Sequence, residues 1–475
     1  MNYVLNGHNY IDDVVSVLMM FYPNDKYIQT DNTLDGITVL SSLNGNTAYS
    51  EVYYNGELKA KSEAIAENDS QREIKRVIGL SIAKAINSIL NIPLPWGILT
   101  GVRPAKLVSE AWNEGKTTDE IRHTFKDKYL VSDEKLNLMI KVAEEEKKIV
   151  EGGIGKAGLY IGIPFCPTRC LYCSFTSYPL KQYSAKVDTY IDALIKEMEF
   201  SKRYLDNVEL ESLYIGGGTP TSLNEKQLDK LLTNVEKCFK IPMEFTVEAG
   251  RPDTITEDKL RILKEHNVSR ISINPQTLNN ETLKLIGREH SVEMFLNAFE
   301  MARKVGHKHI NTDIILGLPN EGEKEVANTM EGLLKLSPES ITVHTLAVKR
   351  ASRLKETLDR YEMTDAAKMD KLIGISRQYT EKMGMSPYYM YRQKNMVGNF
   401  ENVGYCKPNC QCIYNVAIME EKQSILALGA GGSTKLVNTK TNQIERIFNV
   451  KSVDDYITRI DEMLERKKNI KLLVN

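Results

Sequence analysis

Three cysteines lie within eight residues of the sequence, in the segment Cys166-Pro-Thr-Arg-Cys170-Leu-Tyr-Cys173. Thiolates at this spacing can lie on one tight loop and bind one metal centre. The segment follows the apolar, β-rich run Leu159–Ile163, which predicts a buried strand. Loops at the carboxyl ends of buried strands are where α/β proteins place their chemistry. Three ligands rather than four leave one position open, where a further molecule can bind and be activated.

Spacing alone leaves four interpretations of these cysteines open. A structural zinc site normally has four ligands, and no fourth Cys or His lies nearby in the sequence. A thioredoxin-like pair would use Cys170 and Cys173 but would leave Cys166 without a role. Buried cysteines that cluster by chance are a third interpretation. An iron–sulfur cluster held by three thiolates uses every cysteine and leaves one iron open.

From Leu159 to about Met383 the sequence alternates between apolar strand patterns and helical patterns. Apolar strands joined by helical crossovers predict a parallel sheet with right-handed connections. Six such units favour an open, partial (β/α) barrel over a closed eightfold one, so we expect an α/β fold. The predicted strands are Leu159–Ile163, Leu210–Ile215, Glu244–Glu248, Arg270–Asn274, His309–Leu316 and Ser340–Leu346. The predicted helices include Asp188–Tyr204, Lys226–Phe239 and Glu257–Asn267.

Residues 1–151 predict a separate N-terminal α+β module. Gly36–Leu43 and Thr47–Tyr54 alternate like the strands of a hairpin around a turn at Asn44-Gly45-Asn46. The pattern Ser70-x-x-Glu73 predicts a capping box at the start of a helix. Further charged helices are expected up to about Val150.

The remaining boundaries follow from composition. The glycine-rich residues 152–158 predict a linker, and the barrel is expected over residues 159–384. Residues 385–475 predict an α+β extension with a hairpin around Asn442 and a final helix from near Ser452.

Charge and hydropathy exclude several classes of partner. The chain has 62 Lys and Arg against 63 Asp and Glu, so its balance does not indicate binding to nucleic acid. Its longest apolar runs are far shorter than a bilayer span, and no signal-peptide pattern opens the chain. Seven cysteines, six of them in two clusters, indicate ligand or redox use in a reducing compartment. We expect a soluble, cytoplasmic monomer that does not insert into membranes.

The segment from Tyr160 through Pro164-Phe165 and the three cysteines resembles the signature of radical S-adenosylmethionine (SAM) enzymes. Within them it resembles the oxygen-independent coproporphyrinogen III oxidase-like branch. The resemblance implies that Cys166, Cys170 and Cys173 hold a 4Fe–4S cluster whose fourth iron is chelated by SAM. It also implies that one electron from the cluster cleaves SAM to a deoxyadenosyl radical, and that Tyr160 and Tyr172 help to position SAM.

Further polar motifs follow the successive predicted strands. Gly216-Gly217-Gly218-Thr219 comes after the second strand, where glycines let backbone N–H groups approach a bound group. The resemblance implies that this loop and Glu248, after the third strand, contact SAM. It associates Gln276, Arg288 and Asp313 with a second SAM molecule. Each residue also has an ordinary alternative as a turn, a helix cap or a solvated charge.

The blocks Trp96–Pro104, Tyr391–Tyr405 and Glu420–Gly432 resemble the HemZ-type coproporphyrinogen dehydrogenases. This implies oxidative decarboxylation of coproporphyrinogen III to protoporphyrinogen IX without oxygen, as a step of heme biosynthesis. It also implies a flavodoxin- or ferredoxin-like electron donor. Arginines at the barrel mouth, with Arg350 and Arg392 as candidates, are expected to bind the substrate's propionates.

Two departures from the branch bear on the substrate. Phe175 occupies the place where well-studied members have a fourth cysteine, and Gly162 replaces a histidine. The chain has no match to the His-Asn-x-x-Tyr-Trp heme motif of the related heme chaperones, because Tyr414-Asn415 lacks both the histidine and the tryptophan. A radical SAM methyltransferase that opens heme anaerobically and a heme-binding chaperone stay as alternative functions.

A second cysteine group has the spacing Cys406-x-x-x-Cys410-x-Cys412. This spacing matches no standard cluster-binding pattern, so we expect unligated thiols in a loop near the active site. A second cluster or metal site is the alternative. Cys238, on an apolar helix face, is predicted to belong to the core.

Overall fold

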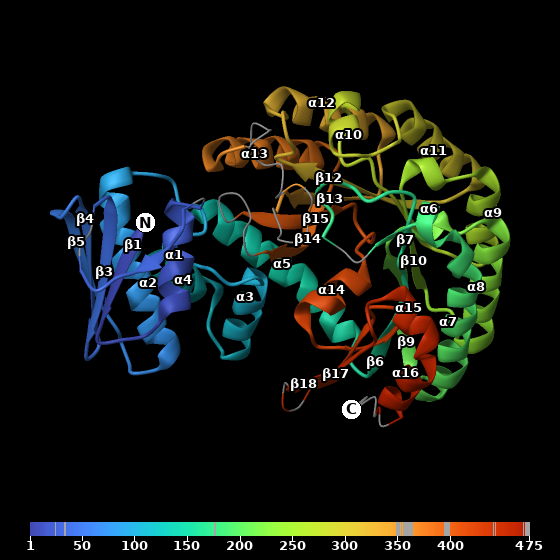
Figure 1. The fold of residues 1–475 in the computed structure, drawn as a ribbon, viewed down its shortest axis with the longest axis horizontal. Helices are drawn as coiled ribbons and strands as arrows, with labels where there is room; N and C mark the ends of the chain where they lie inside the picture. Colours follow the sequence, from blue (N-terminus) through green and yellow to red (C-terminus); the bar gives the residue numbers. More distant parts are fainter. Residues whose placement is uncertain are drawn as a thin grey trace. The chain divides into compact units, whose positions relative to one another are not determined.

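The computed structural model describes residues 1–475 apart from 24, 33–34, 175–176, 348–351, 353, 355–363, 394–399, 440, 442, 469 and 471–475. The described chain forms two compact units (Figure 1). The N-terminal unit holds Met1–Lys141, Asp365–Ala367 and Arg392–Phe400. The barrel unit holds Val142–Thr364, Lys368–Tyr391 and Glu401–Asn475. No helix in the described part of the chain is long and apolar enough to cross a membrane.

The N-terminal unit contains a five-stranded sheet with two helices on one face (Figure 1). Its strands are β1 (Asn2–Asn6), β2 (Ile28–Gln29), β3 (Ile37–Asn44), β4 (Thr47–Tyr54) and β5 (Glu57–Ile65), in the order β2-β1-β3-β4-β5. Helices α1 (Ile11–Phe21) and α2 (Gln71–Leu90) cover the apolar face. The predicted hairpin is confirmed, because Asn44 pairs with Thr47 across a two-residue turn.

Only half of the predicted capping box forms at the start of α2. The Ser70 side chain accepts a hydrogen bond from the Glu73 backbone N–H, as expected. The Glu73 carboxylate does not return to the Ser70 N–H, because it binds the Arg76 guanidinium and the Glu67 N–H instead. Pro104 opens α3 (Pro104–Asn113), where its missing N–H costs nothing. Helices α4 (Thr118–Tyr129) and α5 (Asp133–Gly152) follow.

The connection between α5 and the barrel is shorter than the linker predicted over residues 152–158. Helix α5 continues to Gly152 and strand β6 (Lys156–Ile163) begins four residues later. The division between the two units falls between Lys141 and Val142, inside α5.

The barrel unit is built on an eleven-stranded sheet with the order β14-β15-β13-β12-β11-β10-β9-β6-β16-β17-β18. The six predicted strands lie together in chain order and pair in parallel, which confirms the open α/β barrel. Besides β6 they are β9 (Glu209–Gly217), β10 (Glu244–Gly250), β11 (Arg270–Ile273), β12 (His309–Leu316) and β13 (Ser340–Thr345).

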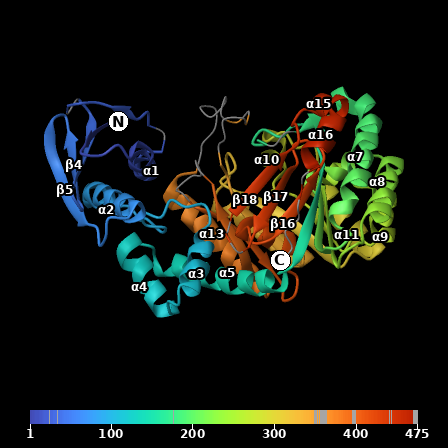
Figure 2. The same ribbon diagram turned by 90° about the horizontal axis from the view of Figure 1, so that it is seen from below.

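Helices cover the outside of this sheet (Figure 2). Helices α7 (Val187–Ser201), α8 (Glu225–Cys238), α9 (Glu257–Glu265) and α11 (Val292–Val305) pack side by side in that order. The crossovers are completed by α10 (Asn280–Leu285) and α12 (Glu323–Leu336), and α13 (Ala366–Lys382) follows β13. Short strands β7 (Phe165–Cys166) and β8 (Tyr178–Pro179) and helix α6 (Leu180–Tyr183) lie between β6 and α7.

The C-terminal residues 385–475 extend both edges of the barrel sheet rather than forming a sheet of their own. Strands β14 (Ser386–Arg392) and β15 (Glu401–Cys406) lie beyond β13, and β15 is antiparallel to it. On the other side, β16 (Ser424–Leu428) pairs in parallel with β6, followed by β17 (Ser433–Asn438) and β18 (Gln443–Phe448). Strands β17 and β18 form the predicted hairpin, although Asn442 itself lies outside the described residues. Helix α14 (Ile413–Glu420) precedes β16, and Ser452 caps α15 (Val453–Thr458) before α16 (Ile460–Lys467).

Alternate positions on the barrel strands differ in chemistry. One set is apolar and buried under the outer helices, as at Ile161, Ile215 and Val247. The other set is polar or small and faces the interior. Its members include Tyr160, Gly162, Tyr214, Gly216, Thr246, Glu248, Ser272, Asn274, Asn311, Asp313, Thr342 and His344. This alternation supplies the polar interior from which a site can be built.

A buried ion pair ties the C-terminal helix to the barrel. Lys467 Nζ on α16 lies 2.7 Å from Glu197 Oε1 on α7, and both side chains are fully buried. The carboxylate also accepts hydrogen bonds from the Asn449 side chain, the Tyr456 hydroxyl and the Gly429 N–H. Gly429 follows β16 with φ +92°, and a Cβ there would lie 2.6 Å from the Gly162 carbonyl oxygen. The network therefore holds the end of β16 against β6.

We expect Lys467→Met to destabilise the barrel unit by about 3–5 kcal/mol, because it leaves the Glu197 carboxylate buried without its cation. The measurement is the free energy of unfolding from the urea transition of that unit. Lys468→Met is the matched control, since Lys468 is exposed and pairs with exposed Glu465. Equal stability of the two variants would contradict the assignment.

Candidate functional site

The cysteine loop is anchored to the carboxyl edge of the barrel sheet by backbone hydrogen bonds. Beyond the β6–β9 ladder, Gly218 N–H donates to Ile163 O at 2.8 Å and Thr219 N–H to Phe165 O at 2.7 Å. Farther along, Leu171 N–H donates to Ile286 O at 2.9 Å, in the segment after α10. The loop is thus bonded to two different crossovers of the barrel before the chain reaches α6.

The three thiols lie in this loop at different depths. Cys170 is buried, and Cys166 and Cys173 are half-buried. The Cys166 Sγ lies 3.5 Å from the Thr219 Oγ1. The pKa of Cys166 is raised to about 11, chiefly by burial, with a smaller rise from the other two thiols and an opposing effect of the Thr219 hydroxyl. Thiolates at this position therefore need a cationic centre to stabilise them.

The donor set fits a 4Fe–4S cluster. In the described residues no three His, Cys, Asp or Glu side chains converge on one point as a mononuclear site requires. In a cubane each cysteine binds a different iron, so the three sulfurs need not converge. Three thiols on one loop fit a cluster that keeps one iron free.

Glycines allow the ends of β6, β9 and β10 to approach closely. A Cβ on Gly218 would lie 2.5 Å from the Phe165 carbonyl oxygen, and one on Gly216 would lie 2.9 Å from Glu248 Oε2. Gly217 has φ +109°, and its N–H donates to Glu248 Oε2 at 3.3 Å. The predicted glycine loop and Glu248 are therefore in direct contact.

The barrel interior raises the pKa of Glu248 to near neutrality, where its carboxylate can gain or lose a proton. Its pKa is raised to about 7, chiefly by burial and to a smaller extent by the charge of Asp313. Hydrogen bonds from the Tyr214 hydroxyl, 2.5 Å from Oε1, and from Gly217 act in the opposite direction. Tyr214 is not among the site residues that the sequence predicts, because it lies within a strand that is apolar overall.

Three tyrosine rings stack beneath this carboxylate. The rings of Tyr214 and Tyr414 are 4.4 Å apart, and Tyr160 lies 6.0 Å from Tyr414 and 6.4 Å from Tyr214. Tyr414 comes from α14, far along the chain, and its backbone N–H is bound by Glu244 at 2.9 Å. In the sequence it was considered only as part of an absent heme motif.

A polar network joins Asp313 to neighbouring strands. Its carboxylate accepts hydrogen bonds from the side-chain amides of Asn274 at 2.9 Å and Asn311 at 2.8 Å. His344 Nε2 on β13 lies 3.8 Å away. Burial alone would raise the pKa of Asp313, but His344 and the hydrogen bonds outweigh burial and lower it. Asp313 is therefore an ionised group that holds three strand ends together.

Gln276 and Arg288 lie next to this network. Gln276 has φ +67°, and its backbone N–H donates to Asp313 O at 3.0 Å. Its buried Oε1 accepts no hydrogen bond from the described residues, so it can accept one from a bound molecule. Arg288 instead donates to the Asn274 carbonyl at 3.2 Å and to the Tyr172 hydroxyl at 3.3 Å, which ties it to the cysteine loop.

Comparisons with known proteins agree with this geometry. Residues 160–333 match the model of the Radical SAM superfamily. Over 414 residues the chain is 38% identical to HemZ of Bacillus subtilis, an oxygen-independent coproporphyrinogen-III oxidase-like protein, covering 86% of this chain and 83% of HemZ. The chain belongs to the radical SAM superfamily, in its oxygen-independent coproporphyrinogen III oxidase-like family.

Two further proteins are similar to part of this chain. The heme chaperone HemW of Bacillus subtilis is 39% identical over 193 residues, which are 40% of this chain and 50% of HemW. The solved structure of coproporphyrinogen III oxidase HemN from Escherichia coli has a TM-score of 0.53 and 21% identity, covering 68% of this chain and 73% of HemN. The HemN likeness establishes the radical SAM fold. The family implies a 4Fe–4S cluster and SAM.

The predicted site residues come together at one edge of this fold. The carboxyl ends of β6 and β9–β12 and the loops after them carry the whole predicted set. Its members are Tyr160, Cys166, Cys170, Tyr172, Cys173, Gly216, Gly217, Gly218, Thr219, Glu248, Gln276, Arg288 and Asp313. Arg392 belongs to the N-terminal unit, where its guanidinium donates to the Leu99 carbonyl at 2.5 Å and lies over the Trp96 ring. Arg350 and Phe175 lie outside the described residues.

The second cysteine group lies at the opposite edge of the barrel sheet, not near the active site as expected. Cys406 pairs with Ser340, the first residue of β13, so it marks the amino edge. Burial raises the pKa of Cys406 and of Cys412 to about 12. Cys412 Sγ lies 3.6 Å from the carboxylate of Glu244, which also pairs with Arg270. These contacts anchor the start of α14.

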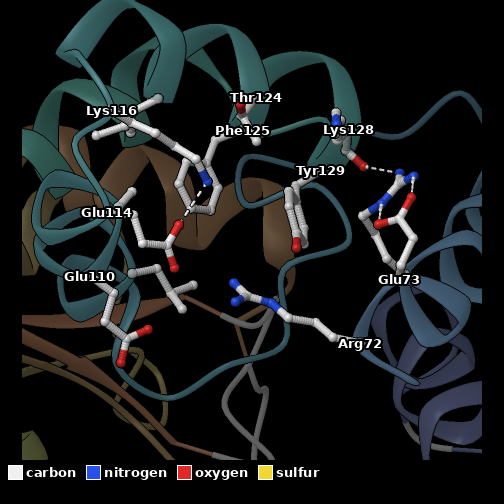
Figure 3. Close-up of a pocket in the computed structure, with 13 residues that line it drawn as sticks. Arg72, Glu73, Glu110, Glu114, Lys116, Thr124, Phe125, Lys128 and Tyr129 are labelled. Atoms are coloured by element: carbon white, nitrogen blue, oxygen red, sulfur yellow. Dashed lines mark hydrogen bonds and ion pairs between the residues drawn. The ribbon is translucent and has the colours of Figure 1, made fainter. Parts of the chain in front are cut away.

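A separate hollow in the N-terminal unit lies between α2, α3 and α4 (Figure 3). Its charged side chains are of both signs, and two pairs bond within the lining: Arg76 with Glu73 at 2.6 Å and Lys116 with Glu114 at 2.9 Å. Because charges of both signs line the hollow, it presents no surface of a single sign. It is unlike the convergent site of the barrel.

Proposed function

We propose that this protein is a radical SAM enzyme that oxidatively decarboxylates coproporphyrinogen III to protoporphyrinogen IX without oxygen. The proposal rests on one observation: the cysteine loop, the Gly216–Thr219 loop and Glu248 lie together at the carboxyl ends of the barrel strands. The likeness to HemZ over most of both chains supports the choice of substrate class.

The cofactors would be held by residues already in place. Cys166, Cys170 and Cys173 would bind the 4Fe–4S cluster, which supplies the electron that cleaves SAM. Glu248, whose carboxylate faces the Gly216–Thr219 loop, would pair with the cationic groups of SAM. The N–H groups of Gly218 and Thr219 already donate to backbone carbonyls at the start of the cysteine loop. The glycine loop would therefore contribute to SAM binding by letting SAM approach the backbone closely and through the Thr219 hydroxyl.

A second SAM molecule would depend chiefly on Gln276. Arg288 and Asp313, also predicted for that role, already bind Tyr172, Asn274 and Asn311. Only the Gln276 side-chain carbonyl combines burial with unused hydrogen-bonding capacity among these three residues. We therefore propose one SAM bound by Glu248 and the glycine loop, with Gln276 as the main contact of a second.

The proposed reaction converts two propionate side chains in turn, and in each conversion one hydrogen atom is removed, carbon dioxide leaves and a vinyl group forms. The remaining electron passes to a one-electron acceptor. We propose further that a flavodoxin- or ferredoxin-like protein delivers the reducing electron, and that the enzyme acts in the cytoplasm as a monomer.

Two other functions are alternatives, and one of them has specific support. The likeness to HemW favours a heme chaperone, although the sequence lacks the heme motif expected there. A methyltransferase that opens heme would use the same cofactor site with a different substrate. The three candidates differ in what they release from coproporphyrinogen III and from heme.

Replacing Cys170 with alanine is expected to abolish the visible absorption of the reconstituted cluster and all deoxyadenosine formation, because one cluster ligand is lost. Absorption spectra and chromatography of SAM cleavage products measure both. Cys410→Ala, in the second cysteine group, is the matched control and should retain both signals. Full deoxyadenosine formation by Cys170→Ala would contradict the assignment of the three cysteines as cluster ligands.

SAM binding is expected to weaken as the pH falls through about 7, because the Glu248 carboxylate gains a proton there and no longer attracts a cation. Tyr214→Phe removes a hydrogen bond that stabilises the carboxylate, so the midpoint should move up by about one pH unit. Anaerobic calorimetric titration with SAM across the pH range measures both midpoints.

Tyr414→Phe keeps the ring stack and is the control for Tyr214→Phe, with no expected change in midpoint. Identical midpoints for Tyr214→Phe and the unmodified protein would contradict the role given to the Glu248 carboxylate.

Anaerobic incubation of the reconstituted, reduced protein with SAM and coproporphyrinogen III is expected to yield protoporphyrinogen IX and carbon dioxide. Mass spectrometry of the tetrapyrroles, with heme as a parallel substrate, makes the measurement. A methylated linear tetrapyrrole from heme would favour the methyltransferase. Tight heme binding without SAM cleavage would favour the chaperone.

A further inference from the structure

One buried cation beside the cysteine loop has no place in the function described so far. Arg251 follows β10 and is 3% exposed. Its guanidinium donates from Nη1 to the Thr168 carbonyl at 3.2 Å and to the Thr168 hydroxyl at 2.7 Å. Thr168 lies between Cys166 and Cys170, so Arg251 bonds directly to the part of the loop that spans two thiols.

The other side of the same guanidinium is fixed to the barrel. Its Nε and Nη2 donate to the two oxygens of Asp253 at 2.9 and 2.6 Å. The Arg251 carbonyl in turn accepts the Thr254 N–H at 3.0 Å and the Thr254 hydroxyl at 2.8 Å. A planar guanidinium that binds both oxygens of one carboxylate is fixed in orientation. The Arg251 donor that binds Thr168 is therefore rigidly held.

Charge provides a second link to the thiols. Arg251 and Arg288 both lie close enough to Cys170 for its thiolate charge to act on them. Arg251 approaches from the end of β10, and Arg288 from the segment after α10. A cluster bound by three thiolates is anionic and becomes more so on reduction. Nearby cations therefore favour the reduced form and raise the midpoint potential.

We propose that Arg251 is a positioning residue for the cluster, which holds the loop between Cys166 and Cys170 and makes the cluster easier to reduce. The inference rests on the proposed cluster but not on the tetrapyrrole substrate. Cluster occupancy and potential can be measured without turnover. Loss of the substrate assignment would therefore leave it standing.

The test uses the full-length, reconstituted protein. Arg251→Gln is expected to move the cluster's midpoint potential to a more negative value, measured by an anaerobic redox titration followed by electron paramagnetic resonance. Removal of iron by a chelator should be faster by about tenfold, because the bonds to Thr168 are weakened. Arg261→Gln, which removes an exposed arginine paired with Glu257 on α9, is the control and should change neither quantity.

Two further variants separate charge from anchoring. Arg251→Lys keeps the charge but cannot bind Asp253 and Thr168 together, so iron loss should accelerate while the potential stays near that of the unmodified protein. Thr168→Val removes only the hydroxyl acceptor and should likewise accelerate iron loss at an unchanged potential. Thr168→Val also provides the anchoring test if Arg251→Gln fails to fold. Unchanged potential and iron retention in Arg251→Gln, or unchanged iron retention in Thr168→Val, would overturn the proposal.

Discussion

The close approach of the ends of β6 and β9 is the constraint on which the site depends. Their ladder brings Gly162 opposite Gly216 and continues through the bond from Gly218 to Ile163. A side chain at Gly218 would overlap the Phe165 carbonyl. Because the strands stay paired to their last residues, the chain must turn sharply into the cysteine loop. That turn places the Cys166 thiol beside Thr219.

Charges in the barrel interior are tolerated because each has partners on adjacent strands. Glu248 is bonded to Tyr214 and Gly217, and Asp313 to Asn274 and Asn311. An unpaired carboxylate in such surroundings would be costly. Two carboxylates in one interior nevertheless differ: Asp313 is held ionised, whereas the pKa of Glu248 is raised. The fixed amide and imidazole partners of Asp313 account for the difference.

Strand periodicity allowed the parallel barrel and the positions of its six strands to be predicted. Periodicity does not show which alternate face is interior, so the sequence predicts Tyr214 only as part of a buried strand. Arg251 follows β10 in the sequence, but its neighbouring residues do not distinguish a buried arginine that binds another loop from a solvated one. The second cysteine group was placed near the active site, whereas the antiparallel pairing of β15 with β13 carries it to the other edge.

The sequence by itself determined the thiol spacing, the glycines at the strand ends and the order of the motifs along the chain. These are local properties, set by residue type and by distances of a few residues. The tertiary structure decided which groups meet: Tyr414 with Tyr214 across 200 residues, and Arg251 with Thr168 across 83. It also decided the pKa of Glu248, because burial and neighbouring charges exist only once the strands have paired.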